Sequence, residues 1–143
     1  MRAHLVVEHF LTEYLEASNP RLPSLQDAGL TFDQKIKLLP DGDAAIRSAI
    51  PGIKRLNKIR NRIAHNLAME LTNEDRSAFL GVEVFAAMRK EKKKRGMLVG
   101  DEPIDVLEDF SKLAAAWLQS GANGTSQKVS RAMIRVAGQG DES

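Results

Sequence analysis

Hydrophobic residues recur along most of the chain at the spacing of α-helices, and no segment shows a convincing strand pattern. Within residues 3–17, a rotation of about 100° per residue collects the apolar side chains on one face and the glutamates on the other. The apolar face comprises Val6, Val7, Phe10, Leu11, Tyr14 and Leu15. The pattern predicts a first amphipathic helix that packs this face against a core.

Capping and turn residues divide the segment that follows. The capping box that begins at Thr31 predicts a short second helix, and Asp43 suits the N-cap of a third helical piece. Because proline lacks a backbone N–H, we expect Pro51 and Gly52 to interrupt that piece. A separate helix then covers roughly residues 53–64.

The second half of the chain predicts two longer helices. A weaker capping signal at Thr72 opens a helix to about residue 93, whose apolar side chains point almost all round its axis. A helix of this kind is usually central or lies at a subunit interface. Asp101 is expected to cap the last long helix. The broad apolar stripe of that helix is formed by Ile104, Val106, Leu107, Phe110, Leu113, Ala114, Trp117 and Leu118.

These elements together predict an all-α protein. The expected fold is an antiparallel bundle of four or five helices over residues 1–120. Glycine and polar residues at 121–125 indicate a linker, so we expect residues 121–143 to be a linker followed by a basic tail. Residues 128–136 of that tail form either a short basic helix or a disordered segment.

Composition excludes several classes of protein. The chain has 143 residues and no cysteine, which suits one domain and excludes disulfides, thiolate metal sites and cysteine nucleophiles. No segment reaches the roughly 20 apolar residues that span a bilayer, and glutamates near the N-terminus argue against a signal peptide. The histidines lack neighbouring metal ligands, and no glycine-rich phosphate loop is present. We therefore expect a cytoplasmic protein with no membrane contact, no metal and no cofactor.

The most informative polar pattern lies in residues 56–66. Arg60 projects inside the apolar face of this helix, and burying an unpaired guanidinium there is very costly. Arg60 must therefore be paired, or face a cleft or a partner. Asn57, Asn61 and His65 form a polar strip beside it. The apolar face itself is marked by Ile53, Leu56, Ile59, Ile63 and Leu67.

Residues 60–65, with the letters RNRIAH, resemble the Arg-x4-6-His motif of the HEPN superfamily, including the polar residue that often follows its arginine. The wider pattern, from Phe32-Asp-Gln-Lys-Ile through Ile59-Arg-Asn and Ala64-His, also resembles the mannitol operon repressor group. The likeness covers the layout of residues 1–90 and is specific around the motif. It implies a HEPN-type bundle.

The HEPN resemblance implies a metal-independent endoribonuclease, such as a toxin or a phage-defence effector, in which two subunits bring their motifs together across a cleft. RNA carries its own nucleophile, the 2′-hydroxyl, so cleavage needs a base and charge stabilisation. His65 would move the proton, Arg60 would hold the phosphate, and Asn61 would orient His65 or contact phosphate. Toxins paired with a nucleotidyltransferase often carry tyrosine where this chain has Leu67, so control by nucleotide transfer is not expected.

RNA would also need cationic and polar contacts outside the motif. The net charge is only +2, but residues 89–95 hold six positive side chains and one negative. This run suits phosphate neutralisation, and it equally suits a solvated helix end, where the helix dipole favours cations. The residues expected to bind RNA are Lys54, Asn57, Arg62, Lys92, Lys93 and Lys94.

A second interpretation stays open beside the nuclease. His65 can simply cap a helix end, and Arg60 can form an internal or interfacial salt bridge. The chain would then be a non-catalytic regulatory or protein-interaction protein, similar to the mannitol operon repressor group. Both interpretations predict a homodimer, and a further regulatory protein or antitoxin is an expected partner of the nuclease.

Overall fold

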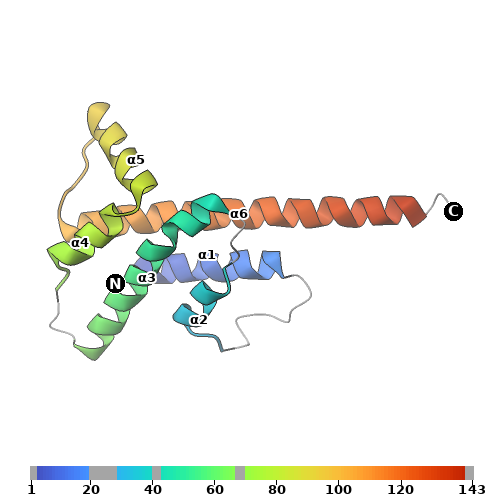
Figure 1. Cartoon of the computed structure of the whole chain (residues 1–143), viewed down its shortest axis with the longest axis horizontal. Coiled ribbons are helices and arrows are strands. Elements are labelled where there is room, and N and C mark those ends of the chain that lie inside the picture. Colours follow the sequence, from blue (N-terminus) through green and yellow to red (C-terminus); the bar gives the residue numbers. More distant parts are fainter. Residues whose placement is uncertain (1–2, 20–28, 40–42, 67–69, 141–143) are drawn as a thin grey trace.

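The computed structural model describes residues 3–19, 29–39, 43–66 and 70–140, with side chains described as far as residue 124. These residues form helices α1 (Ala3–Ser18), α2 (Phe32–Lys37), α3 (Ala44–His65), α4 (Asn73–Leu80), α5 (Glu83–Lys94) and α6 (Pro103–Gly140), and none of them is in a strand (Figure 1). The all-α prediction is confirmed. None of the helices in the described ranges has an apolar stretch long enough to cross a lipid bilayer.

Helix α6 is the axis of the fold, and the first half of it is covered by α1, α3 and α4 (Figure 1). Helices α1 and α6 lie side by side and run in the same direction, since Ala3 borders Leu107 and Tyr14 borders Gly121. Helix α3 runs the opposite way along α6, with Ile46 also beside Gly121. The antiparallel prediction is therefore wrong for α1 and α6. The four helices between them let the chain return to the same end of the bundle.

The core lies between α6 and the helices that cover it. Phe110 of α6 stacks on Phe79 of α4, with ring centroids 5.0 Å apart, and meets the ring of Phe85 edge-on at 5.5 Å. Aliphatic side chains of α1, α3 and α6 complete the buried cluster. It includes Val7, Leu11, Leu15, Ile46, Ile53, Leu56, Ile59, Leu107 and Leu118.

Helix α3 is continuous through Pro51, so the predicted interruption is wrong. Pro51 lies on the exposed side of the helix, where the carbonyl of Arg47, which loses its N–H partner, can bond to water. Gly52 is buried against the Phe110 ring of α6, and a Cβ at this position would overlap that ring. The glycine therefore marks the close approach of two helices and not a break.

The helix predicted over residues 72–93 is two helices, α4 and α5, which meet at Gly81 and Val82. The capping box at Thr72 is present as predicted, with Asp75 as its second member. Because the two axes differ, Phe79 and Phe85 both reach the core from helices that are each apolar on one side only. The bundle thus has six described helices where four or five were predicted. The break also removes the ground on which a dimer was expected from this segment.

Helix α6 begins at Pro103 and runs on through residue 140, so the predicted linker at 121–125 is wrong. The predicted N-cap, Asp101, instead places its carboxylate 2.8 Å from the Lys93 ammonium of α5. Helix α5 ends at Lys94, close to the predicted end at about residue 93. Gly96 has a φ of 75°, and the next amide, of Met97, bonds back to the Lys92 carbonyl, which is a Schellman motif. Residues 141–143 lie outside the described part of the chain.

Candidate functional site

The 60–65 motif forms the last turns of α3, at the end where this helix projects beyond α1 (Figure 1). Arg60 is half-buried, whereas Asn61 and His65 are exposed. Within the described residues, neither Arg60 nor His65 makes a side-chain hydrogen bond or an ion pair. The expected partner for Arg60 is therefore not found in the described chain, and its guanidinium remains available to a ligand or a second subunit.

Arg60 and His65 leave the helix in different directions. Five residues at 3.6 residues per turn separate two side chains by about 140° around the axis. Ile63, three residues after Arg60, faces the neighbouring helix ends, whereas Asn61 and His65 lie toward solvent. One copy of the chain thus presents the arginine and the histidine of the motif to different sides.

A buried ion cluster, which was not predicted from the sequence, anchors this end of α3. The carboxylate of Asp75, one of two acids in the first turn of α4, is only 1% exposed and accepts hydrogen bonds from two arginines of α3. Arg62 bonds to both carboxylate oxygens, with its Nη1 3.2 Å from Oδ1, and Arg55 Nε lies 2.9 Å from Oδ1. The Thr72 amide also donates to this carboxylate, at 2.9 Å. The capping pattern was the available signal, but it does not reveal a partner on another helix.

The electrostatics of this cluster favour the ionised acid. Burial of the Asp75 carboxyl would by itself raise its pKa, but the hydrogen bonds from Arg62, Thr72 and Arg55 outweigh burial and hold the pKa well below its usual value. The same pair raises the pKa of Arg62. The ion cluster therefore carries two positive charges and one negative charge at neutral pH, and it ties the motif end of α3 to α4.

The other residues expected to bind RNA lie in two separate places. Lys54 is exposed and Asn57 half-buried, both on α3. The guanidinium of Arg62 is held by Asp75, and its contact with RNA stays a prediction. The basic end of α5 points to the opposite side of the molecule from the motif end of α3 (Figure 1), so one chain does not bring Lys92, Lys93 and Lys94 to the motif.

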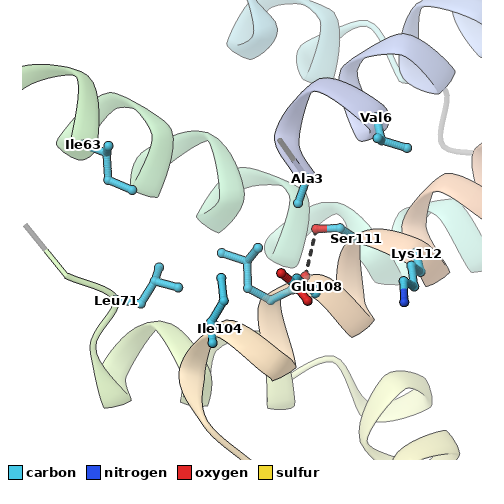
Figure 2. Close-up of a pocket in the computed structure, with 9 residues that line it drawn as sticks. Ala3, Val6, Ile63, Leu71, Ile104, Glu108, Ser111 and Lys112 are labelled. Carbon is cyan, nitrogen blue, oxygen red and sulfur yellow. Dashed lines mark hydrogen bonds between the residues drawn. The ribbon is translucent and has the colours of Figure 1, made fainter. Parts of the chain in front are cut away.

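An apolar groove of about 370 Å³ opens beside the motif, between the start of α1, the end of α3 and the start of α6 (Figure 2). We call it the α1–α6 groove. Ser111 is the only uncharged polar side chain among its lining residues, and its hydroxyl already donates to the Leu107 carbonyl, at 2.8 Å. Two charged side chains from successive turns of α6 border it. The lining residues are Ala3, Val6, Ile63, Leu71, Ile104, Leu107, Glu108, Ser111 and Lys112.

From the sequence, Val6 and Ile104 are expected on apolar helix faces that pack against the core. In the structure they are 46% and 45% exposed, because they lie where α1, α3 and α6 diverge. The groove forms at this point of divergence. A helical repeat shows which side of a helix is apolar, but it does not show where the neighbouring helix ends.

Comparison with known proteins found no family model that matches the chain, and no curated protein or solved structure that is similar to it. The HEPN resemblance therefore rests on the residues of the 60–65 motif and their setting.

Proposed function

We propose that the protein is a metal-independent endoribonuclease of the HEPN type, with Arg60, Asn61 and His65 as its catalytic residues. One observation carries the proposal. The arginine and the histidine of the motif lie at a projecting helix end, and neither is engaged by another described residue of the chain. A catalytic base and a phosphate-binding cation both need this availability.

The residue types suit cleavage of RNA by its own 2′-hydroxyl. His65 takes the proton from this hydroxyl or gives one to the departing 5′-oxygen, because an imidazole can serve as either base or acid. Arg60 binds the phosphate and stabilises its added negative charge through a planar set of donors. Asn61 orients His65 or contacts the phosphate. The bond from phosphorus to the 5′-oxygen breaks, which leaves a 2′,3′-cyclic phosphate and a 5′-hydroxyl.

A second copy of the chain would bring an arginine close to the motif histidine, which one copy alone does not do. Because Arg60 and His65 point about 140° apart around α3, a phosphate next to one side chain is not directly next to the other. Two α3 ends that meet across a cleft would place the arginine of one subunit near the histidine of the other. The Asp75 ion cluster supports this arrangement, because it holds the motif end of α3 in a defined position.

The α1–α6 groove favours a second candidate function, that of a non-catalytic interaction or regulatory protein. An apolar hollow with exposed Val6 and Ile104 at its edge is typical of a protein-binding surface. In this case Arg60 and His65 would contact a partner, such as a regulatory protein, and would catalyse no reaction.

Expression in a bacterial host separates the two candidates. We expect wild-type protein to slow growth and degrade cellular RNA, and the Arg60→Ala/His65→Ala variant to do neither. The matched control is Arg47→Ala/His9→Ala, which removes the same two residue types at exposed helical positions outside the motif. Intact RNA with the wild-type protein, or equal degradation by the motif variant, would favour the interaction protein.

A further inference from the structure

The basic end of α5 and the loop that follows it form the outermost part of one side of the molecule (Figure 1). We call residues 90–99 the α5 tip. We propose that the α5 tip binds the surface of a negatively charged lipid bilayer. The proposal goes beyond the nuclease, because the tip lies on the opposite side of the molecule from the motif end of α3 and brings no side chain to it.

The α5 tip carries positive charge that the protein does not neutralise. Lys90 and Lys94 are exposed one turn apart on α5, and neither forms an ion pair with another described residue. The acids that form ion pairs in the tip, Glu91 and Asp101, are each bound to one of its other cations. The charges of Lys90 and Lys94 are therefore available to a partner. Clusters of this kind are attracted to the anionic headgroups of a bilayer.

The α5 tip also carries aliphatic side chains that lie in water. Leu98 is fully exposed, and its neighbour Met97 is 54% exposed. Both ends of this loop are fixed by hydrogen bonds. The Met97 amide donates to the Lys92 carbonyl at 3.0 Å, and the Arg89 guanidinium donates to the Gly100 carbonyl. The fold thus presents two large aliphatic side chains in a defined position beside exposed lysines.

Arg89 ties the α5 tip to the rest of the bundle. Its side chain is only 5% exposed, and its guanidinium also bonds to the Asp109 carboxylate of α6. The same guanidinium lies 5.6 Å from the centre of the Phe85 ring, which belongs to the core. The loop that holds Leu98 is therefore anchored through a buried arginine, while the end of α5 projects away from α6 (Figure 1).

The combination of lysines and aliphatic side chains favours a bilayer over RNA. RNA bases stack on aromatic side chains, and residues 90–99 contain none. RNA phosphates could pair with the lysines, but they would leave Leu98 and Met97 in water. At a bilayer, the headgroup phosphates bind the ammonium groups, and the aliphatic side chains enter the boundary between headgroups and acyl chains.

The bilayer contact that we propose is a surface contact. The expectation of no membrane contact rests on the absence of an apolar segment of roughly 20 residues, which a spanning helix needs. A loop that inserts two side chains among the headgroups does not need such a segment.

Cosedimentation with vesicles tests the role of the charges. The full chain is mixed with vesicles of phosphatidylcholine alone, or of phosphatidylcholine and phosphatidylglycerol in equal parts. We expect binding only to the anionic vesicles, and weaker binding as added salt screens the attraction. Lys90→Gln/Lys94→Gln should bind about 30-fold more weakly. The matched control is Lys54→Gln/Lys58→Gln, which removes two exposed lysines at the same spacing on α3 and should bind like wild type.

Leu98→Ser tests the role of the aliphatic side chains. We expect it to weaken binding to anionic vesicles about tenfold, because the leucine leaves water when the tip inserts. Leu38→Ser is the control, since Leu38 is 51% exposed at the end of α2, away from the tip. Circular dichroism verifies that every variant remains helical.

Three results would overturn the proposal. The first is a wild-type protein that does not bind anionic vesicles. The second is equal binding by the folded tip variants and their controls. The third is a gel shift in which Lys90→Gln/Lys94→Gln loses affinity for RNA while wild type ignores anionic vesicles, which would make the tip a nucleic-acid surface. A wild-type protein that binds vesicles in the expected pattern and cleaves no RNA would support the membrane contact and contradict only the proposed nuclease.

Discussion

Arg62 of α3 and Asp75 of α4 form a bidentate ion pair, in which the guanidinium donates hydrogen bonds to both oxygens of a buried carboxylate. Arg62 lies between Arg60 and His65 in the chain, so the pair fixes the part of α3 that carries the motif. The same carboxylate closes the capping box of α4 through Thr72. The motif is therefore held by a neighbouring helix that contributes no catalytic residue.

Replacing Asp75 with Asn should destabilise the protein. The asparagine side chain has a single acceptor oxygen and no charge. Arg55 and Arg62 would therefore lose their common anionic partner in a largely buried environment. We expect the free energy of unfolding to fall by about 3 kcal/mol, as measured by urea denaturation. Asp33→Asn is the control, because Asp33 is half-exposed and pairs with Lys37 on the surface. It should change stability by less than about 1 kcal/mol.

The same carboxylate predicts a dependence of stability on pH. In the folded protein the pKa of Asp75 is held well below its usual value, whereas in the unfolded chain it is about 3.9. The stabilisation from this group is therefore complete above about pH 4 and is lost as the pH falls further. In urea denaturation at several pH values, the advantage of wild type over Asp75→Asn should be constant near neutrality and should shrink below about pH 4. An advantage that grows in acid would contradict the assigned charge state.

Gly52→Ala tests the close approach of α3 and α6. A methyl group at residue 52 overlaps the Phe110 ring, and overpacking of this kind costs about 1 to 3 kcal/mol, which exceeds the gain of about 1 kcal/mol in helix propensity. We expect a lower melting temperature. Gly124→Ala is the matched control, since a Cβ at this helical position of α6 meets no atom within 4 Å. The control should be neutral or slightly more stable.

Periodicity and capping residues predicted where most helices lie, because these signals act over a few neighbouring residues. The positions of α1 and α2, and the N-caps Thr31, Asp43 and Thr72, follow directly from the sequence. The predicted break at Pro51 and Gly52 is wrong because the effect of these residues on a helix depends on what surrounds them. The exposed face tolerates the proline, and Phe110 of another helix requires the glycine.

The candidate site was predicted in part. The placement of Arg60 and His65 on one helix follows from the local pattern, and the structure agrees. The pairing of Arg62 with Asp75 does not follow from it, because the two residues are thirteen positions apart and α3 carries three other arginines. The groove was missed for a similar reason. It depends on where α1, α3 and α6 end relative to one another, and a pattern within one helix does not contain this information.

Cleavage of RNA by the purified protein is the most direct test of the proposed activity. Total bacterial RNA would be incubated with wild type, Arg60→Ala and His65→Ala in the presence of EDTA, and the ends of the products identified by mass spectrometry. We predict 2′,3′-cyclic phosphate and 5′-hydroxyl ends with wild type, and a rate at least about 100-fold lower with either variant. Both variants should melt near the wild-type temperature, because His65 is exposed and Arg60 makes no ion pair in the described chain. Uncut RNA with wild type, or equal cleavage by a folded motif variant, would contradict the account.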